Sequence, residues 1–397
     1  MSESLKKYDV VIIGAGAAGL MCAIEAGKRN RNVLVLDHKE KPGKKILISG
    51  GGRCNFTNYD ISSENYISNN THFCKSALKR YTQWDFISMV DSYNIKYHER
   101  SHGQLFCDDS ARDLVYMLSS ECEKANVIFQ FNTEINSISK SEDESFKLIT
   151  SNGDIASESL VIATGGLSIP PIGASAFGYD IAKQFGLNVF PQQAGLVAFT
   201  LSEKDKKVFS ELSGIAIDSV VTNSKISFRE NVLFTHRGLS GPAILQISSY
   251  WNAGESISIN LLPDLDILDF LTLQKRNNRD KKIKTVLAEV LPKRVIEILL
   301  PILLLDLTLK SANESNFTSI KNTLQAWEIK PGGTQGYRTA EVTLGGVDCN
   351  ELSSKTMEVR NIKGLYFIGE VLDITGWLGG YNIQWAWSSG WCAGQYT

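Results

Sequence analysis

The feature that most constrains the fold of this chain is a glycine pattern between a strand and a helix. Residues 8–13 form an apolar, β-branched run typical of a buried strand, and residues 20–29 predict a helix. Between them, Gly14, Gly16 and Gly19 form the pattern Gly-x-Gly-x-x-Gly. A second apolar strand over 32–37 ends at an acidic residue, Asp37. The sequence therefore predicts a strand–turn–helix–strand unit at the start of an α/β fold.

Each position in this pattern has a physical role in holding a dinucleotide. Gly14 permits a tight turn, Gly16 lets backbone N–H groups approach a pyrophosphate, and Gly19 lets helix and strand pack closely. The helix N-terminus favours the negative charge of the phosphates. Asp37 lies at about the ~20-residue spacing expected for an acid that accepts hydrogen bonds from ribose hydroxyls. We therefore expect a bound dinucleotide.

Composition excludes several classes of protein. The chain has 397 residues with 43% hydrophobic and 21% charged residues, which is typical of a globular protein of two or three domains. A net charge of −2 excludes a globally basic nucleic-acid binder. Seven scattered Cys without a Cys-x-x-Cys pair indicate no zinc ribbon and a reducing, cytoplasmic location. We expect no metal, and no membrane span, because the apolar run over 295–309 is shorter than the ~20 residues required.

Three further segments favour FAD over NAD as the dinucleotide. A polar loop over 43–58 contains three consecutive glycines, Gly50 to Gly52, and either Lys44 or Arg53 could offset diphosphate charge. Residues 160–166 and 365–373 each read as a buried strand followed by a glycine turn. An extended FAD needs contacts from several strand ends, whereas NAD in a single Rossmann domain does not need the last two.

These segments together resemble a known family. They are similar to the glutathione-reductase-like superfamily of FAD proteins and, more narrowly, to the bacterial flavoproteins typified by the 3-dehydro-bile acid 4,6-reductase-like proteins (BaiN-like, YhiN-like). The resemblance runs end to end and rests on residues 14–19, the string Gly-Gly-Gly-Arg-Cys-Asn-Phe-Thr-Asn over 50–58, and residues 103–107, 234–242, 340–347 and 376–382.

The resemblance implies an α/β fold with a Rossmann-like FAD-binding domain split by a β-rich insert and a helical insert. Shifts in composition at about residues 191, 263 and 327 agree with it. The predicted boundaries are 1–190 and 338–397 for the FAD-binding domain, 191–262 with a return over 327–337 for the β-rich insert, and 263–326 for the helical insert.

The resemblance also assigns parts of FAD to particular residues. It implies the ribose at Asp37, adenine near the Ile135 backbone, and the flavin pyrimidine at a helix that begins near Gly380. Such a helix N-terminus stabilises negative charge at N1 and O2 of reduced flavin. The expected cofactor-binding residues are Gly14, Gly16, Ala17, Ala18, Gly19, Asp37, Lys44, Gly51, Gly52, Arg53, Cys54, Asn55, Ile135, Thr164, Gly165, Gly166, Gly369, Glu370, Asp373, Gly380, Tyr381, Asn382 and Ile383.

The catalytic candidates are fewer. His236 and Arg237 precede a Gly-Leu-Ser-Gly-Pro turn and could bind an acidic or carbonyl substrate or donate a proton; the alternative is a structural turn with a solvent-facing His. Arg338 is a third candidate, or else an ion-pair partner of Glu341. Cys54 has no Cys near it in sequence, so we expect a small packed residue rather than half of a redox pair.

The function expected from these residues is that of an FAD-dependent oxidoreductase. NAD(P)H would reduce the flavin, and hydride would pass from flavin N5 to a small organic acceptor such as an enone-like C=C bond. A second Gly-x-Gly-x-x-Gly unit is absent, so the nicotinamide would bind transiently.

Two alternatives stay open. One is a flavin-dependent RNA-modifying enzyme that uses the basic stretch over 275–284 to contact RNA, and the other is a non-enzymatic redox sensor that uses Cys54. The stretch carries no interleaved aromatic residues, so we interpret it as a solvated face and do not expect nucleic acid as a partner.

Overall fold

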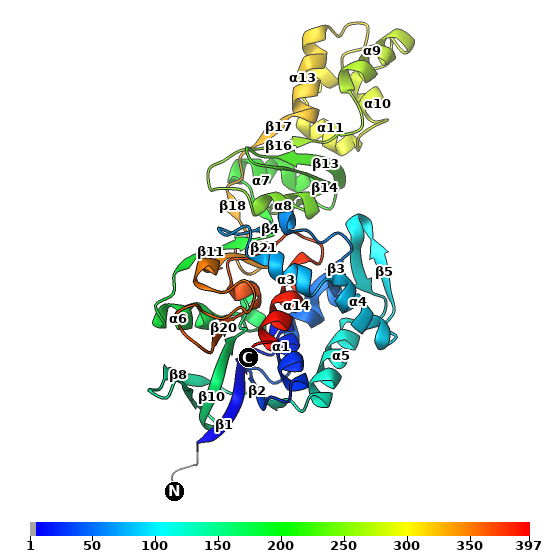
Figure 1. Cartoon of the computed structure of the whole chain (residues 1–397). Helices are drawn as coiled ribbons and strands as arrows, with labels where there is room; N and C mark the ends of the chain where they lie inside the picture. Colours follow the sequence, from blue (N-terminus) through cyan, green and yellow to red (C-terminus); the bar gives the residue numbers. More distant parts are fainter. Residues whose placement is uncertain (1–4) are drawn as a thin grey trace. The chain divides into compact units, whose positions relative to one another are not determined.

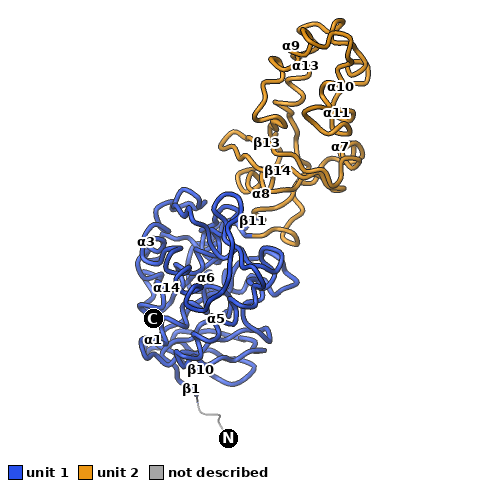
Figure 2. Tube along the Cα trace, turned by 90° about the vertical axis from the view of Figure 1, so that its right-hand side faces the viewer, with its two compact units in different colours: residues 1–193, 342–397 blue, residues 194–341 orange. Residues whose placement is uncertain are grey.

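The computed structural model describes residues 5–397 and divides into two compact units (Figure 1, Figure 2). The first unit is Met1–Gln193 with Val342–Thr397, and the second is Ala194–Glu341. The second unit is therefore an insertion in the first. The predicted α/β class with a split Rossmann-like domain is confirmed, while the finer division into three parts stays a prediction.

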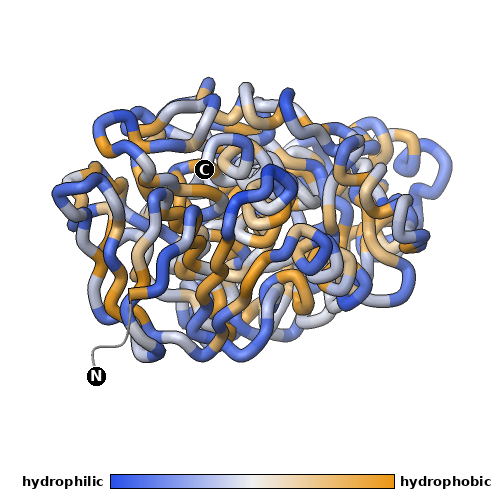
Figure 3. Tube along the Cα trace, turned by 60° about the horizontal axis from the view of Figure 1, so that its bottom comes forward, coloured by the Kyte–Doolittle hydropathy of each residue, from blue (hydrophilic) through white to orange (hydrophobic). Residues whose placement is uncertain are grey.

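The first unit is built on a seven-stranded, mostly parallel sheet in the order β7-β2-β1-β10-β9-β8, with β20 also paired to β10. Its strands are β1 (Lys6–Ile13), β2 (Val33–Leu36), β7 (Ile128–Gln130), β8 (Ile135–Lys140), β9 (Phe146–Thr150), β10 (Gly153–Ile162) and β20 (Leu365–Phe367). β1, β2, β7, β10 and β20 run parallel, and β8 and β9 are antiparallel additions. The apolar runs in β1, β2 and β10 are buried, as expected for strands of a parallel sheet. Figure 3 colours the trace by hydropathy and shows hydrophobic stretches between hydrophilic turns.

The helices of this unit bury their apolar residues against the sheet and each other. They are α1 (Ala17–Lys28), α2 (Lys44–Ile48), α3 (Cys74–Arg80), α4 (Gln83–Ser92), α5 (Ala111–Lys124), α6 (Phe177–Gln184) and α14 (Tyr381–Gly394). α1 and α14 pack closely, since a Cβ on Gly390 would lie 2.4 Å from the Ala18 carbonyl oxygen. The C-terminal aromatic helix predicted from Tyr381 onward is thereby confirmed as part of the core.

Three small sheets accompany the main sheet, and one of them corrects an expectation. They are β3 (Asn55–Asn58) with β6 (Gln104–Cys107) and β5 (Tyr97–Arg100); β4 (Tyr66–Ile67) with β21 (Thr375–Gly376); and β11 (Val189–Gly195) with β19 (Val342–Val347). The predicted loop over 43–58 in fact contains α2 and β3.

The second unit combines a sheet with a helical part. The sheet order is β17-β16-β13-β14-β15-β12-β18. The strands are β12 (Phe199–Thr200), β13 (Ala216–Thr222), β14 (Ser227–Thr235), β15 (Gly238–Ser240), β16 (Ile257–Asn260), β17 (Trp327–Ile329) and β18 (Gly333–Thr334). The helices are α7 (Glu203–Phe209), α8 (Pro242–Ser248), α9 (Ile267–Asn277), α10 (Ile283–Leu287), α11 (Lys293–Leu299), α12 (Ile302–Leu305) and α13 (Glu314–Gln325).

Candidate cofactor site

The parallel register gathers the predicted FAD-binding turns at one edge of the main sheet. Ile13 is level with Ile162 on one side and Leu36 on the other, and Ile162 is level with Phe367. Strands β1, β2, β10 and β20 therefore end together. The residues that follow them are Gly14, Asp37, Ala163 and Ile368, so segments far apart in sequence meet at one edge, where α/β folds bind nucleotides.

The three glycines of the fingerprint have different surroundings. Gly14 has a φ of +112°, and a Cβ there would lie 2.4 Å from the Ala163 carbonyl oxygen. A Cβ on Gly19 would lie 1.9 Å from the Gly14 carbonyl oxygen. A Cβ on Gly16 would meet nothing within 4 Å. Gly14 and Gly19 are thus required by packing, while Gly16 borders open space at the N-terminus of α1, where no side chain caps the helix.

Asp37 is tied to the same turn. Its carboxylate accepts a hydrogen bond from the Ala15 N–H at 2.8 Å and another from the Lys39 N–H at 2.8 Å. The Asp37 carbonyl oxygen accepts from the Thr133 N–H at 3.0 Å, which holds the segment that leads to Ile135 alongside it. The structure therefore places Asp37 and the Ile135 segment together, as their proposed roles around adenosine require.

The ends of β10 and β20 are joined by a charged network. Glu370 lies within 2.6 Å of the Lys45 Nζ and accepts a hydrogen bond from the Thr343 N–H at 2.9 Å. Lys45 also donates to the Ser168 Oγ at 2.7 Å. Gly165 has a φ of +72°, and a Cβ there would lie 4.0 Å from the Glu370 Oε2 of this network. That Lys44 or Arg53 offsets the diphosphate charge stays a prediction, and the cation that pairs with Glu370 is Lys45, the neighbour of Lys44 in α2.

The start of α14 lies against β3, the strand that follows the triple-glycine turn. Gly50, Gly51 and Gly52 all have positive φ, and a Cβ on Gly51 would meet nothing within 4 Å. Gly380, at a φ of +94°, caps α14 without a side-chain hydrogen bond, and its Cβ would lie 2.4 Å from the Thr57 carbonyl oxygen. The loop and the helix N-terminus are thus packed together, and both present backbone rather than side chains.

Side chains near this helix start have structural partners. Asn382 accepts a hydrogen bond from the Gly376 N–H at 2.7 Å and donates to the Gly376 carbonyl oxygen at 2.8 Å, which fixes the preceding turn. Asp373 accepts from the backbone and side chain of Asn69 at 2.8 and 3.0 Å. Burial raises the pKa of the Asp373 carboxyl. Asp373 therefore supports the site through Asn69, and contact with the ribityl chain stays a prediction.

Cys54 has a neighbour that the sequence argument missed. Asn55 on β3 pairs with Phe106 on β6, so Cys54 lies beside Cys107, whose N–H donates to the Arg53 carbonyl oxygen at 2.9 Å. Both thiols are free and buried, and burial raises the pKa of each to about 12. The argument from sequence distance was wrong, because the fold brings a second Cys close. Protonated buried thiols are nevertheless poor nucleophiles, which argues against a redox pair.

Several buried polar atoms lack partners within the protein, and two of them belong to residues near the glycine edge. One is the Thr164 Oγ1, directly after β10, and the other is the Gln130 Nε2, at the end of β7 beside Asp37. Buried polar groups are normally hydrogen-bonded. Together with the open space at Gly16 and Gly51, these atoms fit a long cofactor with phosphate and hydroxyl groups.

The catalytic candidates are not brought together. His236 and Arg237 form the exposed turn between β14 and β15, where the Thr235 Oγ1 accepts from the Arg237 N–H at 3.3 Å. The Arg237 carbonyl oxygen accepts from Leu201, beyond one end of β12. Arg338 follows β18, in the segment that runs beside Leu196 at the other end of β12. After this turn, Gly241 occupies the N-cap of α8, and Pro242 is its first residue.

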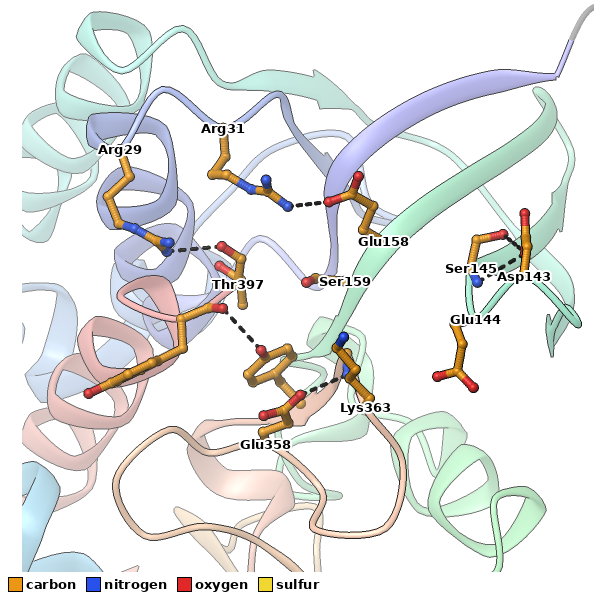
Figure 4. A pocket seen from close by; sticks show the side chains of 13 residues that line it. Arg29, Arg31, Asp143, Glu144, Ser145, Glu158, Ser159, Glu358, Lys363 and Thr397 are labelled. Carbon is orange, nitrogen blue, oxygen red and sulfur yellow. Dashed lines mark hydrogen bonds and ion pairs between the residues drawn. The ribbon is translucent and has the colours of Figure 1, made fainter.

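A separate cavity of about 530 Å³ in the first unit contains none of the expected FAD-binding residues (Figure 4). It is lined by charged residues near the opposite end of the sheet. Arg31 pairs with Glu158 at 2.6 Å, and Arg29 donates to the carbonyl oxygens of Gly394 and Thr397 at 2.9 Å. The lining charges are thus largely paired with the protein itself, and we assign the cofactor to the glycine-lined edge.

Several site residues escaped the sequence analysis. They are Lys45, Ser168, Thr343 and Gln130. Lys45 could have been found by placing a helix over 44–48, whereas the other three carry no local signal, because their partners lie far away in sequence. Among residues 5–397, no cluster of His, Cys, Asp or Glu could hold a metal ion, and no helix is long and apolar enough to cross a membrane.

The fold and the site define an FAD-binding Rossmann protein of the oxidoreductase type. Over its whole length the fold matches a 3-ketosteroid-Δ4-(5α)-dehydrogenase from Rhodococcus jostii, at 14% identity and a TM-score of 0.51, covering 99% of this chain and 98% of that one. Residues 8–396 match the family described as HI0933-like protein Rossmann domain. The chain belongs to this family, which confirms the coarser part of the resemblance stated above.

Two relatives are similar over nearly their full length. One is a ribosomal RNA dihydrouridine synthase of Escherichia coli, at 56% identity over 98% of each chain. The other is a 3-dehydro-bile acid Δ(4,6)-reductase of Clostridium scindens, at 27% identity over 97% of each chain.

Proposed function

We propose that this protein is a flavin-dependent enzyme that reduces a uridine of ribosomal RNA to dihydrouridine. The observation that carries the proposal is the 56% identity, over 98% of both chains, to a protein named for that activity. The bile-acid reductase is half as similar, at 27%. The proposal adopts the RNA-modifying alternative and replaces the expected small-molecule acceptor.

The two substrates share one chemistry, which explains why an enone-like acceptor was a reasonable expectation. In uracil the C5=C6 bond is conjugated with the C4 carbonyl group. Hydride adds to C6, the electron pair of the double bond moves towards C5, and a proton completes the C5–H bond. Bound FAD, once reduced by a donor such as NAD(P)H, supplies the hydride equivalent. A donor that binds transiently fits a chain with one Gly-x-Gly-x-x-Gly unit.

The chain's own residues would hold the cofactor mainly through its backbone. The first turn of α1, beside Gly16, would bind the diphosphate, and the Asp37 carboxylate would accept from the ribose hydroxyls. Lys45, Ser168 and Glu370 would orient the flavin end of the cofactor. The start of α14 at Gly380 would offset negative charge on the reduced ring.

The basic stretch over 275–284 is a weak candidate for RNA contact. Lys282 and Lys284 both pair with Asp306, at 2.9 and 2.8 Å, and Lys281 lies 3.5 Å from Glu289. The neighbouring acids neutralise much of this positive charge, as the interpretation of a solvated face requires. RNA contacts are therefore better sought near the cofactor site.

The function is tested by complementation. An Escherichia coli strain that lacks its own ribosomal RNA dihydrouridine synthase would receive the gene for this chain, and its ribosomal RNA would be digested and examined by mass spectrometry. We expect the modified uridine, two hydrogens heavier, to return. If the RNA stays unmodified while the purified protein reduces a Δ(4,6) 3-oxosteroid with NADPH, the small-enone function replaces the proposal.

A further inference from the structure

We propose that the stacked pair Tyr59–Trp84 is a platform for an unpaired RNA base next to the target uridine. This inference rests on the proposed function. Both residues belong to the first unit, and Trp84 lies in the first turn of α4. None of the expected cofactor-binding residues is involved, and the ligand class is the flat face of a nucleobase.

The exposure of Trp84 is unusual for this chain. Its side chain is 56% exposed, whereas Trp385 and Trp387 in α14 are fully buried. The rings of Trp84 and Tyr59 are stacked, with centroids 5.4 Å apart and an angle of 23° between planes. One face of the indole is thus covered by Tyr59, and the exposed indole surface is available to a base. Stacking of this kind accepts any base, since every base has a π-face.

The platform is held rigidly before any ligand arrives. Gln83 donates from its side chain to the Tyr59 carbonyl oxygen at 2.9 Å, which joins α4 to the loop that carries Tyr59. The Tyr59 N–H donates to the Gly103 carbonyl oxygen at 2.9 Å. Asp85 accepts from the Thr82 N–H at 2.7 Å and fixes the first turn of α4. Such pre-organisation lowers the entropic cost of binding.

The same loop leads to the expected flavin end of the cofactor. Asn58, the residue before Tyr59, is buried and donates through Nδ2 to the carbonyl oxygens of Gly379 and His102, each at 2.9 Å. Gly379 immediately precedes the Gly380 cap of α14. One side chain thus connects the platform to the site where the uracil must meet the flavin, so a base held there belongs to a nucleotide close to the target.

An exposed cation near the turn that binds this loop favours a nucleic acid as the occupant. The carbonyl oxygens of His102 and Gly103 accept from Asn58 and Tyr59. Arg100, on β5 and two residues before His102, is exposed, and its guanidinium lies 4.2 Å from the Phe106 ring centre. The carboxylate of Asp60 lies on the same loop, so the local charge is mixed. Single-strand sites combine stacking with cations that follow the phosphates, and this arrangement supplies both in small number.

The test compares Trp84→Ala with Tyr116→Ala, a matched change at an aromatic residue of α5 that is 70% exposed. The probe is single-stranded oligouridine, with affinity measured by fluorescence anisotropy on the FAD-loaded protein. We expect W84A to weaken binding by about 5- to 100-fold, which corresponds to loss of one stacked base. W84F, which keeps a ring, should restore most of the affinity, and Y116A should bind like the wild type.

The binding measurement and the complementation assay separate failure of the platform from failure of the proposed function. If W84A binds oligouridine like Y116A and the wild type, the platform is overturned, even when complementation shows dihydrouridine. If W84A weakens binding but the wild-type chain forms no dihydrouridine, the platform stands and the proposed function falls. If W84A does not fold, the platform is tested by tryptophan fluorescence of the wild type and of W84F. Oligouridine should quench the fluorescence of the wild type more than that of W84F. Equal quenching of the two would overturn the platform.

Discussion

The two ends of the main sheet both offer space and polar groups, but they do so in different ways. At the carboxyl end, the open space is lined by glycine backbone, by the N-terminus of α1 and by the unpartnered Oγ1 of Thr164. At the other end, a cavity of about 530 Å³ is lined by long charged side chains that largely pair with one another or with backbone carbonyl oxygens, although the Arg31 Nε and the Thr397 Oγ1 lack hydrogen-bond partners.

The difference lies in the kind of group that lines each space, since both ends contain buried polar atoms without a protein partner. The Arg31–Glu158 pair and the Arg29 hydrogen bonds satisfy much of the charge of the cavity. Backbone N–H groups at a helix start and a buried hydroxyl have no such partners, and a ligand with phosphates would supply them. Each prediction below alters one end and asks whether the other is affected.

The largest effect is expected from Gly19→Val. Its Cβ would lie 1.9 Å from the Gly14 carbonyl oxygen, inside van der Waals contact with backbone that cannot move alone. We expect the folded state to lose more than about 3 kcal/mol, the upper part of the range for overpacking. Chemical denaturation measures this loss. A variant as stable as wild type would show that the turn can open.

Gly16→Val should separate cofactor binding from folding. Gly16 has a φ of −84° that any residue adopts, and a Cβ there meets nothing within 4 Å. The apo protein should therefore unfold at the wild-type denaturant concentration. The valine side chain would occupy the space expected for the diphosphate, and FAD affinity should fall about 10- to 100-fold, as for loss of one or two charge-assisted hydrogen bonds. Flavin absorbance after dialysis measures it, and full retention of FAD would contradict the site.

Lys45→Met and Lys44→Met form a matched pair. Lys45 lies 2.6 Å from the Glu370 carboxylate, and its side chain is 42% exposed, so solvent screens the pair. We expect K45M to weaken FAD binding by about fivefold, near 1 kcal/mol, and K44M to change it less. Titration of apo protein with FAD compares them. A larger loss of FAD affinity for K44M than for K45M would favour Lys44, which the sequence offers as an alternative to Arg53, as the cation that offsets the diphosphate.

Arg29→Ala tests the charged cavity. The guanidinium donates to the carbonyl oxygens of Gly394 and Thr397, so its loss should lower the free energy of unfolding by about 1 kcal/mol. FAD affinity should be unchanged, because this end of the sheet does not contact the glycine edge. A variant that loses flavin at wild-type stability would assign a ligand role to the cavity.

The smallest effect at neutral pH is expected from Cys54→Ser. Burial raises the thiol pKa to about 12 from the ordinary value of 9.0, so the native state keeps the proton that the unfolded chain loses first. The contribution of the Cys54 thiol to the free energy of unfolding is fully present below pH 9 and is lost as the pH rises from 9 towards 12. We expect no difference in flavin reduction rate at pH 7 between C54S and wild type, measured by anaerobic bleaching with NADPH, and a flatter alkaline stability curve for C54S.

The glycine fingerprint allowed much of the first unit to be predicted. The roles predicted for Gly14, Gly16 and Gly19 agree with the packing around each glycine, because these roles depend on local backbone geometry. The convergence of Asp37, Thr164 and Glu370 could also be expected, since parallel strands end at one edge.

Contacts that depend on long-range register could not be predicted. Whether Lys44 or Lys45 reaches Glu370 depends on where α2 begins, and the pairing of Cys54 with Cys107 depends on the β3–β6 alignment. His236 and Arg338 are both catalytic candidates by sequence, yet the sheet holds them at opposite ends of β12. Short motifs carry no information about such distances.

The insertion of the second unit has a consequence for synthesis. Strand β20 and helix α14, which complete the sheet edge and the flavin end of the site, follow residues 194–341 in the chain. On the ribosome the inserted unit emerges whole before the first unit has its last strand and helix. The main sheet therefore stays incomplete until β20 is synthesised, and the side of β10 that pairs with β20 is uncovered until then. The cofactor site closes only in the last stage of translation, and FAD arriving then would act as the ligand that completes folding.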